Sequence, residues 1–405
     1  MDYIVLSIPI FFILIGVEVL IAKLKASGWY RFNDAISNIS CGIASQITGV
    51  FSKTILIVGY IYLYDHFRLF QIPNNVWSWI ILFIGVDFFY YWFHRFAHEI
   101  SIFWGTHIVH HQSEEYNLSV ALRQSSFQGF ISMFFYLPLA ILGFNPIAFV
   151  TVNAFQTLYQ FWIHTKAINK MPSWFEFIFN TPSHHRVHHG RNPKYIDKNH
   201  GGTLIIFDRM FGTFQEEEEE VVYGVTKPLS SWNPVWANFD WYADMWQDLH
   251  KEMLWSDRIK LLFKKPGWLP AYLGGYRSPK ELEKKEVHVY DTTIPLGLNY
   301  YILFQYLVIL GITSLFLFNV KEFSRIEQII ISVFIILTIV SIGGIFEKRR
   351  WAYFLEILRF LLFIFGLYLI VPFQLILISL SISLSLISIV WIYQYKTLFH
   401  FKQQT

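Results

Sequence analysis

The chain is poor in cysteine and in charged residues, and both shortages exclude certain kinds of site and partner. Its 405 residues include one cysteine, Cys41, in an apolar stretch, so we expect neither a disulfide framework nor a thiolate metal site. Charged residues make up only 15%, and the formal net charge of +3 is too small to indicate a nucleic-acid partner. Any metal is therefore expected to be held by nitrogen and oxygen donors.

Apolar residues are abundant instead: 54% of the chain is hydrophobic, 20% is aromatic, and the mean hydropathy is +0.39. These values are typical of a membrane protein with several spans. Most apolar runs have about the 20 residues that a helix needs to cross the hydrocarbon core. The predicted fold is an all-α, polytopic integral membrane protein with about nine transmembrane helices. The runs lie at about 3–22, 38–63, 77–93, 127–142, 147–163, 299–318, 327–346, 353–372 and 374–395.

Two of these runs, 127–142 and 147–163, are short and are separated by Gly143-Phe-Asn-Pro146, which predicts a helical hairpin. The hairpin is either a thin double span or a re-entrant pair. The first run has no basic segment before it, so we expect it to be retained rather than cleaved as a signal peptide.

Basic residues predict the orientation, because they favour the cytoplasmic side of spans. With nine crossings, all the basic groups that follow spans one, three, five, seven and nine fall on one side, which we expect to be cytoplasmic. The membrane is expected to be a bacterial plasma membrane or a eukaryotic endoplasmic reticulum. The groups are Lys23, Lys25 and Arg31; Arg95; Lys166 and Lys170; Lys348, Arg349 and Arg350; and Lys396 and Lys402.

The longest segment without a span, 165–298, is polar but rich in tryptophan, which favours the membrane–water interface. We expect a cytoplasmic helical cap lying against the bilayer, with an ordinary soluble core as the alternative. The acidic run 216–220 predicts a solvated loop without a metal role. The expected divisions are 1–75 (N-terminal spans), 76–225 (catalytic core), 226–298 (cap) and 299–405 (four-helix bundle). The tryptophans are Trp174, Trp232, Trp236, Trp241, Trp246, Trp255 and Trp268.

Eleven of the fifteen histidines lie between residues 94 and 200, most of them in three clusters. On a helix, residues three or four apart share a face, whereas adjacent residues diverge by about 100°. His94 and His98 can therefore share an ion, while neighbours such as His110 and His111 can reach two different ions. The clusters predict a histidine-rich di-metal site held by the cap. They consist of His94 and His98; His107, His110 and His111; and His184, His185, His188 and His189.

The number of imidazoles favours iron or manganese over zinc. Zinc is satisfied by three or four ligands, whereas eight or nine imidazoles suit two six-coordinate ions with open positions for O2. A di-iron site can attack an unactivated C–H bond, although adventitious zinc would bind the same ligands tightly.

Several other residues are weaker candidates. His164, His184 and His200 are further possible ligands, with capping or supporting contacts as the alternatives. Asp87, within a span and seven residues before His94, is expected to orient a ligand imidazole, and Glu99 either does the same or is a surface charge.

Asn117 and Arg123 either touch a polar head group or cofactor or serve a loop. The four isolated histidines, His66, His250, His288 and His400, are expected to be ordinary surface or interfacial residues.

The sequence around these histidines resembles the fatty acid hydroxylase superfamily of membrane histidine-box oxygenases, and is most similar to its alkylglycerol monooxygenase branch. The resemblance covers about 76–225. At two positions the chain departs from the branch: it has His200 where a tyrosine is expected and Phe207 where a tryptophan is expected. The matching segments are 90–99 (YYWFHRFAHE), 104–111 (WGTHIVHH), 116–124 (YNLSVALRQ), 160–164 (QFWIH), 180–192 (NTPSHHRVHHGRN) and 197–214.

The resemblance implies two iron ions, O2 as co-substrate and a tetrahydropterin as electron donor. It implies hydroxylation of the carbon next to the ether oxygen of an alkylglycerol, drawn from the bilayer, and collapse of the product to a fatty aldehyde and a glycerol derivative. It indicates no residue for the pterin.

Two alternatives stay open. One is a sterol, carotenoid or fatty-acyl hydroxylase or desaturase of the same superfamily, with a different pocket and donor. The other is a histidine-rich metal transporter, which would need polar ligands along a path at mid-membrane. The last four spans hold few ionisable groups and predict a scaffold.

Overall fold

The computed structural model describes residues 3–278, 288–370 and 374–399, and His400 lies outside them. Within these residues every regular element is helical, and extended backbone pairs only in two isolated bridges. The expected all-α architecture is confirmed. The chain divides into two compact units, Met1–Leu229 with Ala237–Val289, and Ser230–Trp236 with Tyr290–Thr405. The four-part division from the sequence stays a prediction.

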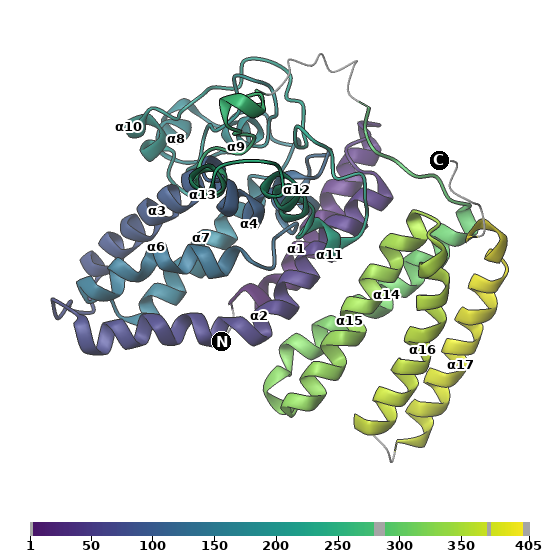
Figure 1. The fold of residues 1–405 in the computed structure, drawn as a ribbon. Helices are drawn as coiled ribbons and strands as arrows, with labels where there is room; N and C mark the ends of the chain where they lie inside the picture. The colour runs from purple at the N-terminus through teal and green to yellow at the C-terminus, as the bar shows by residue number, and fades with distance from the viewer. Residues whose placement is uncertain (1–2, 279–287, 371–373, 400–405) are drawn as a thin grey trace. The chain divides into compact units, whose positions relative to one another are not determined.

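The first unit is built on five apolar helices that pack side by side (Figure 1). Four of them share a core of aromatic and aliphatic side chains such as Tyr60, Val86, Tyr136 and Phe149, and the Tyr60 and Phe149 rings stack at 4.4 Å. The first helix packs separately, with Ile15 in a cluster that includes Phe161. Burial of this apolar surface holds the helices against one another. The helices are α1 (Tyr3–Leu24), α2 (Phe32–Phe67), α3 (Val76–Glu99), α6 (Gln128–Leu142) and α7 (Pro146–Trp162).

Seven of the described helices are long and apolar enough to cross a membrane, so the expected count of nine spans is not confirmed. The difference is the α6–α7 hairpin. With 15 and 17 residues, these helices are about 22 and 26 Å long at 1.5 Å per residue, against a hydrocarbon core of about 30 Å. Gly143, with a φ of +105°, ends α6, and the Asn145 side chain caps α7. Because a hairpin returns the chain to the same side whether or not it crosses, the predicted sidedness of the basic residues is unaffected.

The segment expected to form the cap contains only short helices and loops. Several of its tryptophans are exposed, among them Trp174 (67%), Trp246 (65%) and Trp255 (80%), whereas Trp232 is buried. Their placement at a membrane interface stays a prediction. The short helices of the first unit are α4 (Ser101–His111), α5 (Leu118–Ala121), α8 (Ser173–Ile178), α9 (Pro182–His188), α10 (Ile206–Phe211), α12 (Asp240–Leu249) and α13 (Trp255–Phe263).

The second unit is a bundle of four apolar helices that lie side by side (Figure 1). Ser324 begins the second of them with a capping box to Glu327, which satisfies backbone donors at that end. The bundle consists of α14 (Leu296–Phe318), α15 (Arg325–Phe346), α16 (Arg350–Ile370) and α17 (Leu375–Tyr393).

A fully buried ion pair lies inside this bundle. Glu356 and Arg359, one turn apart on α16, contact each other, and both are at most 2% exposed. The remaining hydrogen-bonding groups of the pair are satisfied by Tyr301 and Gln305 of α14 and Ser341 of α15. The expectation that these spans are a plain hydrophobic scaffold therefore misses a polar network that ties three helices together.

Candidate metal centre

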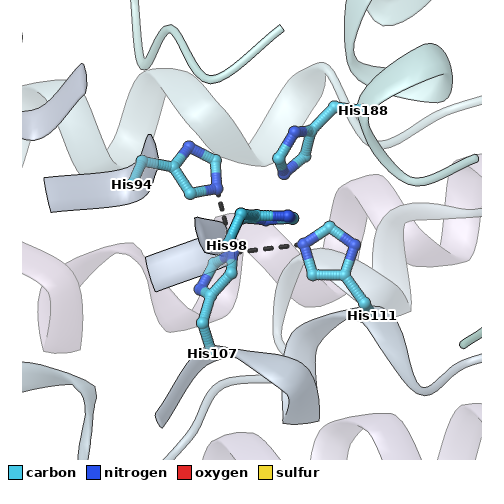
Figure 2. A group of neighbouring side chains, drawn as sticks. All are labelled: His94, His98, His107, His111 and His188. Atoms are coloured by element: carbon cyan, nitrogen blue, oxygen red, sulfur yellow. Dashed lines mark hydrogen bonds between the residues drawn. The ribbon is translucent and has the colours of Figure 1, made fainter. Parts of the chain in front are cut away.

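One group of five histidines gathers where α3, α4 and α9 meet. His94 and His98 come from α3, His107 and His111 from α4, and His188 from α9, and all five are buried. Figure 2 shows their rings turned toward one centre. The Nε2 atom of His107 lies 2.9 Å from that of His94 and 3.1 Å from that of His111.

A second group of four histidines lies beside the first. His110 of α4 faces His164, which follows α7, with 3.1 Å between their Nε2 atoms. His185 and His189 complete it: their Nε2 atoms are 3.2 Å apart, and that of His189 is 3.1 Å from His110 Nε2. All four residues are buried.

The two groups are adjacent, and both include histidines from α4 and from the α9 region. His111 of the first group stacks on His189 of the second, with ring centroids 4.4 Å apart. As the helical spacing predicts, the neighbours His110 and His111 enter different groups, and so do His188 and His189. Nine of the ten predicted ligands are thus brought together, in two sets that suit two ions.

Backbone and amide oxygens fix which nitrogen of several rings carries the proton. Nδ1 of His94 lies 2.7 Å from the His200 carbonyl, and Nδ1 of His110 lies 3.0 Å from the Arg123 carbonyl. Nδ1 of His107 faces the Gln128 amide oxygen at 2.9 Å. A ring that donates from Nδ1 presents the lone pair of Nε2, which is the form that binds a metal. Nδ1 of His164 and His188 faces the carbonyls of Gln160 and Lys198 in the same way.

The donor set fits metal ions. Lone pairs on neighbouring Nε2 atoms about 3 Å apart repel one another unless a cation lies between them, and about 3 Å is the edge of an octahedron whose metal–nitrogen bonds are about 2.1 Å. Within the described part of the chain, Nε2 of His98 and of His188 is buried without a hydrogen-bond partner, as expected of a nitrogen that binds a metal. The residues present could hold one ion in each group.

Burial also keeps the rings neutral. It lowers the pKa of His107 and His164 to about 4 and that of His188 to about 3. Burial, reinforced by the neighbouring histidines, lowers the pKa of His110, His111, His185 and His189 well below the usual value. Neutral imidazole is the ligating form, so the centre is ready to bind metal at neutral pH.

These shifts predict an acid limit for the protein without metal. An unfolded histidine has a pKa of about 6.5, so the unfolded chain binds more protons than the folded one below that pH. We expect the free energy of unfolding of metal-free protein in detergent to be level above pH 6.5. It should fall steadily as the pH is lowered toward 4. Denaturant titrations at several pH values measure it, and a level profile from pH 7 to 4.5 would contradict the assignment of neutral, buried rings.

The comparisons with known proteins agree with this site. A fatty acid hydroxylase family model matches residues 79–213, and a model of the alkylglycerol monooxygenase C-terminal domain matches residues 298–386. The chain is 40% identical to human alkylglycerol monooxygenase over 90% of its own length and 82% of the relative's. The corresponding figures are 40%, 90% and 82% for the Xenopus tropicalis enzyme, and 39%, 88% and 80% for the zebrafish (Danio rerio) enzyme.

The chain belongs to the alkylglycerol monooxygenase family. It is therefore a membrane oxidoreductase with a histidine-rich metal centre, and the resemblance seen in the sequence is confirmed. More distant relatives include a sterol desaturase of Schizosaccharomyces pombe, 30% identical over 40% of this chain. No solved structure matches. The hydroxylase match spans every histidine of both groups, and the C-terminal match falls on the second unit.

Two further histidines lie outside both groups. The His184 ring packs against Phe214 at 5.4 Å, away from the converging nitrogens. His200, which replaces the tyrosine expected in this family, has its ring 5.1 Å from the His98 ring, and both its ring nitrogens are buried without a hydrogen-bond partner in residues 3–278, 288–370 and 374–399. His184 therefore joins neither set, and His200 packs behind the first.

Asp87 affects the metal centre indirectly, through a loop that contacts His94. Its two carboxylate oxygens accept the backbone N–H groups of Thr203 and Leu204, each at 2.8 Å, so the expected direct contact with a ligand imidazole is not what the structure shows. It anchors the loop whose His200 carbonyl faces His94 Nδ1. The reason is proximity: Gly202 brings the loop so close that a Cβ there would lie 3.0 Å from the Asp87 carboxylate.

Sequence reasoning missed the partner of Asp87. Asp208 accepts the backbone N–H groups of His200 and Gly201, each at 2.7 Å, and thus holds the first half of the same loop. Burial raises the pKa of Asp208 to about 6. Asn199, with a φ of +55°, ties the loop to the carbonyl of His184. The signal in the sequence was the run Asn199-His-Gly-Gly202, because glycines between polar residues mark a tight backbone approach.

The other weaker candidates have structural roles. Glu99 is partly exposed and pairs with Arg95 at 3.2 Å, which corresponds to the surface-charge alternative. Asn117 caps α5 through Ser119 N. The buried Arg123 guanidinium donates to the Val109 carbonyl and to the Asn38 side chain of α2. Asn117 and Arg123 therefore hold the loop in place, which was the alternative to contact with a head group or cofactor.

Proposed function

We propose that this protein is a di-iron monooxygenase that uses O2 and a tetrahydropterin to hydroxylate the carbon next to the ether oxygen of alkylglycerols. The observation that carries the proposal is the pair of all-imidazole groups, five and four histidines, at the ends of apolar helices. The named relatives are alkylglycerol monooxygenases that align with most of both chains, and they support the substrate. The tetrahydropterin is what the family resemblance implies.

The chain's own residues would bind the two iron ions and orient the imidazole rings that hold them. His94, His98, His107, His111 and His188 would hold one iron and His110, His164, His185 and His189 the other, and bound iron would supply the O2 chemistry. The carbonyls that face Nδ1 keep each ring in its ligating tautomer. Burial of every histidine in both groups restricts the access of water, which limits loss of oxidising power to solvent.

The reaction balances as follows. One atom of O2 enters the C–H bond as a hydroxyl group, and the other leaves as water after taking up two electrons and two protons from the donor. The product carries a hydroxyl and an ether oxygen on one carbon. It is a hemiacetal, which splits to a fatty aldehyde and a free glycerol hydroxyl.

We further propose that the centre faces the cytoplasm. The basic residues that follow the odd-numbered spans support this orientation, because positive charge favours the cytoplasmic side. The ether carbon of a glycerol lipid lies at the boundary between head group and chain. A centre at the ends of the helices is at that depth, so the alkyl chain need not leave the bilayer.

The test is turnover of an alkylglycerol by purified protein loaded with iron under anaerobic conditions. We expect fatty aldehyde to form only when both O2 and a tetrahydropterin are added, with about two irons per chain. Turnover of a sterol or fatty acyl lipid with a protein reductase, and none with the pterin, would favour the alternative within the superfamily. Metal transport into vesicles without turnover would favour the transporter, but convergence of the histidines in one buried centre argues against a path.

A further inference from the structure

A second feature of the first unit is a cavity of about 250 Å³ beside the histidines. His98, His111 and His188 of the first group and His189 of the second form part of its wall. The rest of the lining comes from α4, α12, α13 and the loops around 190–197, 224–227 and 265–277, all outside the spanning helices. A molecule in this cavity would approach the metal centre from the cap, not from the bilayer.

The walls of the cavity suit a flat ring. Trp104, Trp241 and Trp268 all line it, and indole faces stack on planar heterocycles. Trp104 also lies 4.8 Å from the His98 ring and 5.5 Å from the His111 ring, so a molecule stacked on Trp104 is next to these histidines. The volume is just below the range of about 300–1,000 Å³ usual for small-molecule sites, so the occupant is compact.

The polar groups of the cavity suit a ring with both a carbonyl and N–H groups on one edge. Nε of Arg191 is buried and has no hydrogen-bond partner among the described residues, although its NH1 donates to the Val225 carbonyl. It can donate to a carbonyl oxygen. Asp197, Asp244 and Asp248 also line the cavity, and carboxylates accept paired N–H donors strongly.

One ion pair among the lining residues, between Lys227 and Asp244, can open at little cost in free energy. Asp244 is paired with Lys227, whose side chain is 65% exposed, and exposed pairs of this kind contribute little stability. A ligand that brings two N–H groups can therefore take the place of the lysine. A lipid tail has no group that would use these charges.

We propose that this cavity binds the reductant of the reaction, a compact planar nitrogen heterocycle of the reduced pterin class. This inference rests on the proposed function, because hydroxylation needs two electrons and two protons from a donor, and a tetrahydropterin releases both on oxidation to its dihydro form. The amino-pyrimidinone edge faces the carboxylates and Arg191. The ring that is oxidised lies against Trp104 and the histidines. A protein reductase would dock on the surface and would not need the cavity.

The experiment measures binding rather than turnover. A dihydropterin, which does not reduce the centre, is titrated into the full-length protein in detergent, and the heat of binding and the tryptophan fluorescence are recorded. We expect quenching in the wild type and binding weaker by about 10-fold or more in Asp244→Asn and in Trp268→Leu. Helix α12 offers matched controls: Asp240→Asn and Trp246→Leu carry the same changes at residues that do not line the cavity, and should bind normally.

The outcomes separate the two proposals. Equal binding by wild type and both cavity variants, with the variants correctly inserted, would overturn the assignment of the cavity even if pterin-dependent turnover persists. Loss of binding in the cavity variants alone would support it, even if no alkylglycerol is turned over. Turnover with a protein reductase and no pterin binding would overturn it.

Discussion

Replacing His188 with alanine is expected to abolish turnover while leaving the protein in the membrane. His188 is on α9, and its ring lies 4.3 Å from the His94 ring and 4.7 Å from the His111 ring. Its Nε2 has no hydrogen-bond partner among the residues that the structure describes. Removing a residue that only supports a ligand costs about 10–100-fold in metal affinity or activity, so removing a ligand should cost more than about 100-fold. We expect the iron content to fall from two toward one per chain. Metal analysis and product assays measure these effects, and His98→Ala should behave in the same way.

The matched control is His184→Ala, four residues earlier on the same short helix. His184 is equally buried, at 3% against 4% for His188, but it packs against Phe214 outside both groups. The two variants therefore remove the same side chain at the same depth, and only one removes a converging nitrogen. If His184→Ala lost iron as His188→Ala does, the grouping would be wrong. If His188→Ala kept its iron and its activity, His188 would not be a ligand.

The histidine centre could be predicted from the sequence because its information is local. Spacings of three and four residues place imidazoles on one helix face, and adjacent histidines such as His110 and His111 must diverge. The structure brings the histidines of the three clusters together as expected, apart from His184, and His164 at the end of α7 joins the second group. A hydrophobic helix of about 20 residues is equally local, so most of the spanning helices were found.

Contacts between distant segments could not be predicted. Asp87 and Asp208 hold successive parts of one loop, and nothing in the spacing of 121 residues between them reveals it. Asp87 shares a helix face with His94, which suggested a direct contact, but Gly202 lets a backbone segment come between. Whether the α6–α7 hairpin crosses the membrane could not be predicted either. A difference of a few residues in the length of α6 decides whether the helix is long enough to span the bilayer.

Removing one partner of the buried ion pair in the second unit is expected to destabilise that unit strongly. Glu356→Leu leaves the Arg359 guanidinium, 2% exposed, without its counter-charge among apolar helices. Breaking a buried pair in this way typically costs about 3–5 kcal/mol. Tyr301 and Ser341, which donate to the Glu356 carboxylate, would lose their acceptor as well. Thermal unfolding in detergent, or protease cleavage of the helix connections, would report the loss.

The double variant Glu356→Leu/Arg359→Leu decides whether charge or packing is responsible. Exchanging both members of a buried pair for apolar residues of similar size is often neutral or stabilising, because the cost of desolvating both charges disappears. We therefore expect the double variant to regain most of the stability that Glu356→Leu loses. If it were as unstable as the single variant, Glu356 would contribute through packing or through its bonds to Tyr301 and Ser341. Both metal-binding histidine groups lie in the other unit, and the described residues of this unit contain none, so iron content should stay near two per chain in every variant that remains folded. Loss of iron in the double variant would instead show that this bundle supports the metal centre in the other unit.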